Sequence, residues 1–151
     1  METLFSNALR RYNQLYCMES QLYHEAAVRL GLSESQFWML YALCDAEKAL
    51  SQREIAAAIG MPKQTVHSAV GQMLQAGCLQ REERPGRECG LRLTAAGRRL
   101  ADETVIPVIQ RENSAFADLT AQERETLLCL KEKYDRRLAA RLADLPQRNK
   151  E

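Results

Sequence analysis

The chain has 151 residues, with 21 basic and 20 acidic side chains and a formal net charge of +1. This length fits one domain, or one compact core that carries an extension. A composition of 46% hydrophobic and 27% charged residues is ordinary for a globular protein and excludes wholesale disorder. No apolar run approaches the roughly 20 residues of a membrane span, and no signal-peptide pattern opens the chain. We therefore expect a cytoplasmic protein with no membrane partner.

Five cysteines are scattered along the chain, and none stands at Cys-x-x-Cys spacing. They are Cys17, Cys44, Cys78, Cys89 and Cys129. Their odd number and their spacing argue against a disulfide framework and against a zinc site. We expect buried, reduced thiols and no metal site.

Positive charge is concentrated in the middle of the chain. Residues 51–100 carry eight basic and four acidic side chains, whereas residues 1–50 and 101–151 have net charges of −2 and −1. A polyanion would therefore dock on the middle third. An excess this small also arises by chance, so it becomes informative only if the same segment has a shape that fits DNA.

Helical periodicity dominates the rest of the sequence. Apolar residues recur at steps of three and four from about residue 4 to residue 30. Capping boxes that begin at Ser33, Ser51 and Thr120 mark three further helix starts, the last of them for a helix over about 121–143. With only seven glycines and four prolines, the chain is expected to be mainly α-helical.

Residues 51–76 read as two short helices with a tight break between them. Gly60 supplies the turn because it has no Cβ, and Pro62 is tolerated in a first helical turn. The second helix is expected over 62–76. The spacing of apolar residues across the break is typical of a helix–turn–helix, although a helical hairpin in an ordinary core has the same pattern.

Residues 79–93 change to a strand pattern around a Pro-Gly turn. We expect Leu79 to pair with Leu93, which leaves Pro85, Gly86 and Arg87 as a three-residue tip. A hairpin directly after the second helix favours the winged form of the motif. The sequence thus predicts a winged helix–turn–helix lobe over residues 33–97.

The two ends of the chain predict long amphipathic helices outside this lobe. Thr94 can cap a helix over about 95–116, which Pro107 should kink or break. The regions 1–32 and 98–145 either pack on each other or form a two-fold interface with a second copy. Residues 146–151 are expected to fray.

Polar side chains occupy the face of the second helix opposite its apolar stripe. The N-terminal end of this helix enters the major groove in helix–turn–helix docking. Gln64 can pair with adenine, Ser68 suits a base or a phosphate, and Lys63 suits a phosphate. His67 is either a base contact or a solvated histidine. A close approach to the sugar–phosphate backbone would explain Gly71, and so would drift.

Arginines flank the helices and the hairpin tip. Arg53, Lys63, Arg84 and Arg87 would supply phosphate contacts, with a salt slope of about −3.6 per subunit if all four act. An arginine at a wing tip can also enter a narrow minor groove. Alternatively, Arg84 and Arg87 are solvated and lie near the acidic residues of the hairpin.

The chain resembles the MarR family of winged helix–turn–helix transcriptional regulators. The resemblance is carried by SESQFWMLYAL, SQREIAAAIGMPKQTVHSAVGQMLQAGCLQREE and LRLTAAGRRL, with long helices before and after. It implies a homodimer on pseudo-palindromic double-stranded DNA, and many members are repressors released by phenolic ligands or cysteine oxidation. By position, Gln64, Thr65, His67 and Ser68 become contacts of the recognition helix and Arg87 the wing arginine.

The resemblance also implies a small-molecule pocket and contains one departure. Pockets in this family lie between the dimerisation region and the DNA-binding lobe, where a small aromatic effector could contact Tyr16, Tyr23, His24, Trp38 and Tyr41. Core and interface packing would explain the same aromatic residues. Pro85 stands where the family's wing usually has the Asp of Asp-x-Arg, which alters the support for Arg87.

Three other functions compete with a ligand-controlled regulator. Thiol-based sensing would need Cys17 or an intersubunit pair, because Cys78 and Cys89 lie roughly 17 Å apart along the hairpin. A protein-interaction module on the same scaffold is the second. An enzyme is the third, but no HExxH, glycine-rich phosphate loop or GxSxG is present, and no cofactor is expected.

The predicted DNA-binding residues are Arg53, Lys63, Gln64, Thr65, His67, Ser68, Gln72, Arg84 and Arg87.

Overall fold

A computed structural model describes residues 4–86 and 89–146 of the chain. Within this part the elements are α1 (Asn7–Arg29), α2 (Glu34–Cys44), α3 (Gln52–Ile59), α4 (Lys63–Gln75), β1 (Leu79–Glu82), β2 (Gly90–Leu93), α5 (Ala95–Glu103), α6 (Val105–Ala117) and α7 (Ala121–Ala143). The chain divides into two compact units, residues 1–109 and residues 110–151. The mainly helical fold with a small β-hairpin wing, predicted from the sequence, is confirmed.

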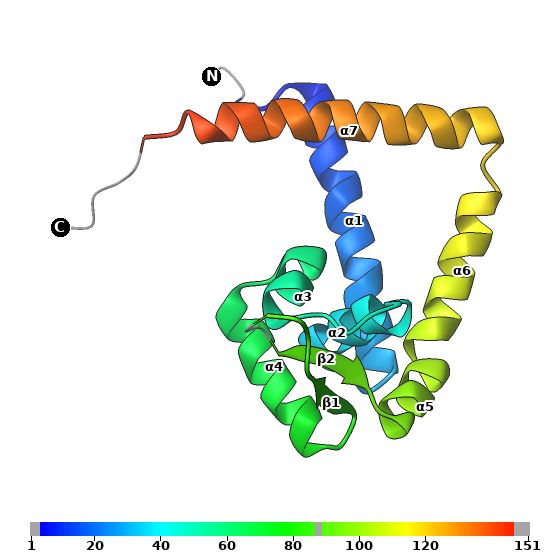
Figure 1. The fold of residues 1–151 in the computed structure, drawn as a ribbon. Coiled ribbons are helices and arrows are strands. Elements are labelled where there is room, and N and C mark those ends of the chain that lie inside the picture. Colours follow the sequence, from blue (N-terminus) through cyan, green and yellow to red (C-terminus); the bar gives the residue numbers. More distant parts are fainter. Residues whose placement is uncertain (1–3, 87–88, 147–151) are drawn as a thin grey trace. The chain divides into compact units, whose positions relative to one another are not determined.

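The core of the first unit lies among α2, α3, α4, the hairpin and α5 (Figure 1). Its largest fully buried side chains are Phe37, Met39, Leu40, Ile55, Leu91, Val66, Val70 and Val105. Full burial of a side chain of this size stabilises the fold by roughly 1.5–3 kcal/mol. Ala27, near the end of α1, also belongs to this core. The helix–turn–helix and the wing are therefore held on one hydrophobic core.

The three predicted capping boxes are present, and each fixes the start of a helix. The side chains of Ser33, Ser51 and Thr120 each accept the backbone N–H of the residue three positions on. The side chain of that residue in turn accepts the backbone N–H of the capping residue. Two helix starts differ slightly from the prediction. The first helix begins at Asn7 because the Ser6 side chain caps it, and Pro62 is the N-cap of α4 rather than its first residue.

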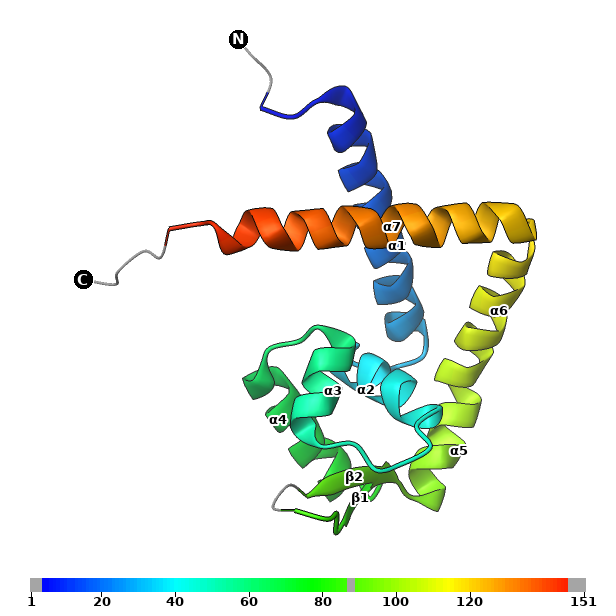
Figure 2. The same ribbon diagram turned by 45° about the horizontal axis from the view of Figure 1, so that its top comes forward.

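The turn between α3 and α4 is set by Gly60, as predicted. This residue has φ +66° and ψ 23°, a left-handed conformation that glycine adopts without a Cβ penalty. Gly60 is the C-cap of α3, directly after its last residue Ile59, and it allows the chain to reverse into α4 (Figure 2). The close pair of helices expected for a helix–turn–helix follows from this turn.

The hairpin has the predicted register, with Leu79 opposite Leu93. Among the described residues the pairing ends at Glu82 and Gly90, before the point to which the expected three-residue tip would extend it. An ion pair between Arg92 and Glu82, with 2.8 Å between Nε and Oε2, joins the two strands diagonally.

A third segment pairs with the hairpin. The backbone N–H of Leu50 donates to the carbonyl of Leu91 at 3.0 Å, and the N–H of Leu91 donates to the carbonyl of Leu50 at 2.8 Å. This bridge attaches the residues that precede α3 to β2, which therefore lies between Leu50 and β1. The wing is therefore joined to the helix–turn–helix at both ends of that motif.

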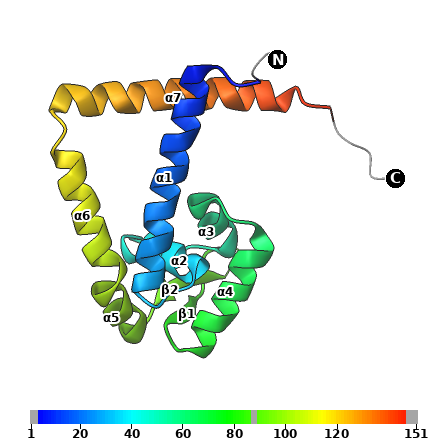
Figure 3. The ribbon, with the colours of Figure 1, turned by 180° about the vertical axis from the view of Figure 1, so that it is seen from behind.

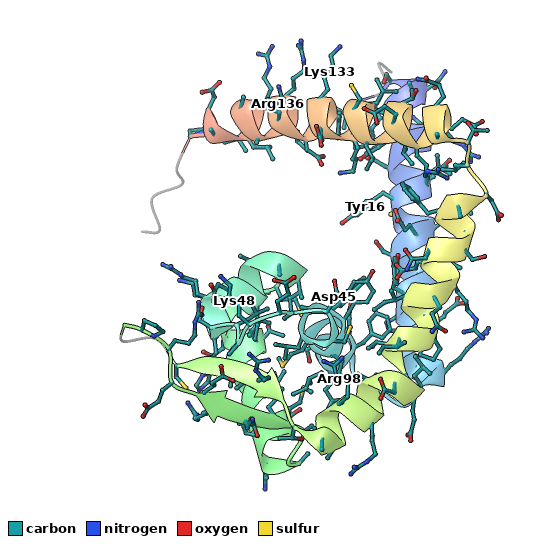
Figure 4. The ribbon with its side chains drawn as sticks, turned by 45° about the vertical axis from the view of Figure 1, so that its right-hand side comes forward. Tyr16, Asp45, Lys48, Arg98, Lys133 and Arg136 are labelled. Carbon is teal, nitrogen blue, oxygen red and sulfur yellow. The ribbon has the colours of Figure 1, made fainter. Side chains whose placement is uncertain are left out.

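The long helix predicted over 95–116 is broken, as Pro107 suggested. The break is at Thr104, with φ −121° and ψ −81°, and it separates α5 from α6. A proline removes one helical hydrogen bond and crowds the carbonyl four residues earlier, which here belongs to Glu103, the last residue of α5. Arg98 of α5 extends its guanidinium to the carbonyl of Cys44 at 2.6 Å and so connects α5 with the end of α2 (Figure 4).

The second unit contains α7, which has no buried residue within this chain. Six large apolar side chains along α7 are exposed: Leu127, Leu128, Leu130, Tyr134, Leu138 and Leu142. Residues 147–151, most of the tail expected to fray, lie outside the described residues.

The expected burial of the cysteines is wrong. Cys17, Cys89 and Cys129 are exposed and Cys44 and Cys78 are half-buried. Cys17, Cys44 and Cys129 lie on helix faces that this chain leaves at least partly uncovered, and Cys78 and Cys89 lie just before the two strands. All five thiols are free. None of the described helices has the length and apolar character needed to cross a bilayer, and the described residues contain no metal-binding group of three or more His, Cys, Asp or Glu.

Candidate nucleic-acid interface

Helix α4 has one buried and one exposed face. Val66, Ala69, Val70 and Met73 are buried in the core, as the predicted inward stripe requires. The helix lies at the outside of the first unit (Figure 3). Six of the predicted contact residues are exposed along it: Lys63, Gln64, Thr65, His67, Ser68 and Gln72. The structure therefore gathers these six side chains on an outer helix surface.

Two of these side chains already have hydrogen-bond partners. Nδ1 of His67 lies 3.1 Å from Oε1 of Gln52, which links α4 to the first turn of α3. The Ser68 hydroxyl donates to the carbonyl of Gln64 at 3.1 Å within α4. The structure therefore adds a role for His67 that neither interpretation included: it bridges the two helices of the motif.

Arg53 and Lys63 are brought together at a surface hollow of about 380 Å³. Ser51 and Gln52 from the start of α3 and Cys89 from the wing also line it. The two cations thus lie where the N-termini of α3 and α4 approach the hairpin. Helix N-termini and cationic side chains both favour anionic groups, so this hollow suits a phosphate of a nucleic-acid backbone.

Arg84 points into the fold instead of lying free at the wing. Its Nη1 binds Oε2 of Glu54 in a short ion pair, and its Nη2 donates to Oε1 of Glu54 at 3.2 Å. The sequence suggested acidic residues of the hairpin as its alternative partners, but the partner is on α3. Arg87 lies outside the described residues, so its position as the wing arginine stays a prediction.

The carboxylate of Glu54 serves two groups. Oε2 also accepts the backbone N–H of Ser51 at 2.7 Å, which closes the capping box of α3. The guanidinium of Arg84, followed by this backbone hydrogen bond, lowers the pKa of Glu54 from 4.5 to about 2. Glu54 therefore stays ionised over the whole range in which proteins normally work.

The aromatic residues predicted as ligand contacts are only partly gathered. Tyr16, Tyr23 and Trp38 line a hollow of about 390 Å³ together with Glu19, Ser20, Glu34 and the α3–α4 turn at residues 59–61. Tyr16 projects from α1 (Figure 4). The Tyr23 and Trp38 rings lie 4.9 Å apart. Tyr41 packs on Trp38 at 5.4 Å without lining the hollow, and His24 is exposed outside it.

Sequence reasoning missed the residues that hold the surface together. Gln52, Glu54 and Leu50 each contact a residue far along the chain. Glu54 was visible as the last residue of a capping box, but nothing in the spacing indicated its second partner. Gln52 had no signal, since a polar residue in a first helical turn is common.

Comparison with known proteins supports the fold and its family. A family model described as MarR family matches residues 30–88. A MarR family regulator from Neisseria meningitidis has 18% identity and a TM-score of 0.80, covering 92% of this chain and 99% of that chain. MepR of Staphylococcus aureus, solved as a DNA complex, has 18% identity and a TM-score of 0.67, covering 89% and 98%.

A further similar structure is that of NadR in complex with 4-hydroxyphenylacetate. It has 19% identity and a TM-score of 0.65, and the match covers 97% of this chain and 99% of that chain. No curated protein sequence is similar enough to count as a match. The resemblance to the MarR family is thus confirmed: residues 30–88 match the family, and the chain has the winged helix–turn–helix fold of MarR family transcriptional regulators.

Proposed function

We propose that this chain is a homodimeric, sequence-specific DNA-binding regulator that acts as a repressor. One observation carries the proposal: the N-terminal half of α4 exposes hydrogen-bonding side chains while its other face is buried in the core. In this arrangement Gln64 and Ser68 read base edges in the major groove, and Lys63 contacts a phosphate. The wing lies beside them, near the minor groove.

The distribution of charge supports the same role. Residues 51–100 carry a net +4, and Arg53 and Lys63 line one hollow at the start of α3 and α4. Phosphates attract such a surface whatever the base sequence, so it supplies affinity while α4 supplies specificity. The fold shared with MepR, which has been solved on DNA, favours DNA over a protein partner.

Unpartnered apolar side chains support the homodimer. Leu22 of α1 is 67% exposed, and Leu130 and Leu142 of α7 are 59% and 54% exposed. Rows of exposed leucines on long helices mark surfaces that a partner covers. A second copy placed by a two-fold axis would cover these surfaces and present two α4 helices to one face of DNA.

We place the effector in the hollow lined by Tyr16, Tyr23 and Trp38. The aromatic side chains suit a small aromatic ring. NadR, which shares the fold, has been solved with one such compound, 4-hydroxyphenylacetate. Glu19 and Glu34 stand at the same hollow, and none of the described lining residues is Lys, Arg or His. Carboxylates repel an anionic ligand, and aromatic rings attract cations. The effector is therefore an aromatic amine or a neutral aromatic compound rather than an aromatic acid.

A mobility-shift titration tests the DNA-binding role. The full chain should shift a duplex taken from the region upstream of its own gene at lower concentrations than it shifts a scrambled duplex of equal length and composition. Equal affinity for both duplexes would remove sequence specificity, and no shift at low salt would remove the function. Transcription from that upstream region in vitro should fall when the protein is added, whereas a rise would contradict repression.

Fluorescence of Trp38, the only tryptophan, tests the effector. Tyramine and 4-hydroxyphenylacetate share a phenol ring and carry opposite charges. Tyramine should quench or shift the emission and release DNA at concentrations where 4-hydroxyphenylacetate does neither. The reverse order would exclude the acidic hollow as the site that sets ligand charge. A Trp38→Phe variant controls for signal from the tyrosines.

A further inference from the structure

Arg84 stands at the point where the wing leaves its own β-ladder. Strand β1 ends at Glu82, and Arg84 lies two residues beyond the last pair of the hairpin. Its guanidinium reaches across to Glu54 on α3, 30 residues earlier in the chain. The side chains of Arg84 and Glu54 are 24% and 36% exposed, so water reaches this ion pair only in part.

The receiving carboxylate is itself fixed in position. Oε2 of Glu54 accepts the Ser51 N–H at 2.7 Å, and the Glu54 N–H donates to the Ser51 hydroxyl at 3.2 Å. Glu54 therefore has little rotamer freedom left for Arg84 to remove. A bidentate contact to a fixed carboxylate defines direction as well as distance.

The stem of the Arg84 side chain packs closely over Gly90. A Cβ built on Gly90 would lie 2.7 Å from Ala49 Cβ and 2.7 Å from Arg84 Cδ, so the stem of Arg84 passes directly over a glycine. Any larger residue at position 90 would have to displace one of these neighbours. The bridge between Leu50 and Leu91 lies one residue further along on both segments.

We propose that Arg84 is a positioning residue, which holds the wing against the start of α3 through Glu54 and binds no DNA phosphate. The proposal rests on the DNA-binding function proposed above. It replaces the phosphate role predicted for Arg84 from the sequence. The ion pair between Arg84 and Glu54 also stabilises a wing that has Pro85 at the position where the resemblance led us to expect an aspartate.

Glu54→Gln separates the two roles of the carboxylate. Glutamine also completes a capping box, so the start of α3 is kept, but the charge that binds Arg84 is lost. If Arg84 positions the wing, Glu54→Gln weakens DNA binding by about 2- to 5-fold, as expected for loss of one partly exposed ion pair. If Arg84 binds a phosphate, Glu54→Gln releases it and removes a negative charge, so affinity is unchanged or higher. The latter result would overturn the proposal.

Arg84→Gln and the double variant complete a cycle. The double variant should bind DNA no more weakly than either single variant, because both singles break the same contact. Additive losses would show that Arg84 acts elsewhere. Arg84→Lys keeps a charge that a phosphate accepts but loses the bidentate contact. It should restore only part of the affinity, and full recovery would contradict a positioning role.

Amide hydrogen exchange tests the contact without DNA. In the free full-length protein, amides of residues 79–82 and 90–93 should exchange about 2- to 5-fold faster in Glu54→Gln and in Arg84→Gln than in the wild type. Amides of α7 serve as the internal reference. Unchanged exchange in the wing would reject the proposal even if the protein binds DNA. Faster exchange in a protein that never binds DNA would reject only the proposed function.

Discussion

Gly97 packs directly against the carbonyl of Cys78. A Cβ added to Gly97 would lie 2.9 Å from the carbonyl carbon of Cys78 and closer still to its oxygen, so both atoms would overlap with it. The same carbonyl accepts the N–H of Thr94 at 3.1 Å, and the Thr94 hydroxyl donates to the carbonyl of Gly77 at 2.6 Å. The first turn of α5 is therefore pressed onto the backbone that joins α4 to the wing.

Gly97→Ala should destabilise the protein. The added methyl group meets backbone rather than a flexible side chain, so α5 or β1 must shift, at a typical overpacking cost of about 1–3 kcal/mol. Gly71→Ala is the matched control, since Gly71 is helical, exposed and has no neighbour within 4 Å of an added Cβ. It should stabilise by roughly 0.5–1 kcal/mol. Urea unfolding measures both, and equal midpoints for the two variants would contradict the contact.

Stability should fall on acidification partly through Glu54. Its pKa is about 2 in the folded protein and about 4.5 when unfolded, so the folded state binds fewer protons between these values. The contribution of Glu54 is complete above about pH 4.5 and is lost as the pH falls towards 2. Glu54→Gln should lose less stability than the wild type between about pH 5 and about pH 3. Parallel losses in urea titrations would show that Glu54 is not involved.

The pKa of Glu123 is lowered as well, by its hydrogen bonds from the backbone and hydroxyl of Thr120. The contribution of Glu123 to stability is therefore also present above its ordinary pKa and is lost as the pH falls below it. Glu123→Gln separates the contribution of the Thr120 capping box from that of the Ser51 capping box in the same urea titrations. A combined variant with Glu54→Gln should show the smallest dependence on acid.

Lys63 and Gln64 should have separable effects on DNA binding. Gln64→Ala is expected to cost about 1–3 kcal/mol on the specific duplex and to reduce sequence preference. Lys63→Ala should weaken all duplexes alike and reduce the salt slope by about 0.9. Gln75→Ala, an exposed glutamine at the far end of α4, is the control and should bind as the wild type does. Identical behaviour of the first two variants would refute the assigned roles.

Leu130→Glu should dissociate the proposed dimer. Leu130 is 59% exposed on α7, and a carboxylate there would have to be buried without a partner in an apolar interface. Gln122→Glu adds the same charge to an exposed position of the same helix and should leave the dimer intact. Sedimentation velocity at about micromolar concentration distinguishes the two species. A wild-type monomer would remove the proposal altogether.

Local signals predicted the elements well, and long-range contacts escaped prediction. The capping boxes at Ser33, Ser51 and Thr120 each depend on residues three positions apart, so the sequence contains all the information they need. The pairing of Leu79 with Leu93 followed from alternation of apolar residues. The contact between Arg84 and Glu54 depends on how α3 and the wing pack, which no local pattern encodes.

The candidate site shows the same division. Periodicity assigned the outer face of α4 correctly, because the opposite face has to fill the core. It did not reveal that His67 bonds with Gln52, since this requires knowing where α3 crosses α4. The exposed cysteines were mispredicted for a related reason: average burial says little about a residue on a helix face that no other part of the chain covers.

The backbone bonds between Leu50 and Leu91 limit how the connection from α2 to α3 can vary. Its residues run from the end of α2 at Cys44 to the paired strand at Leu50, and then directly into the cap at Ser51. One residue inserted between Leu50 and Ser51 would shift the pairing of Leu50 relative to the cap of α3. Exposed residues such as Asp45, Glu47 and Lys48 can therefore vary, whereas the direct junction of Leu50 with Ser51 allows no change in length without loss of the pairing or of the cap.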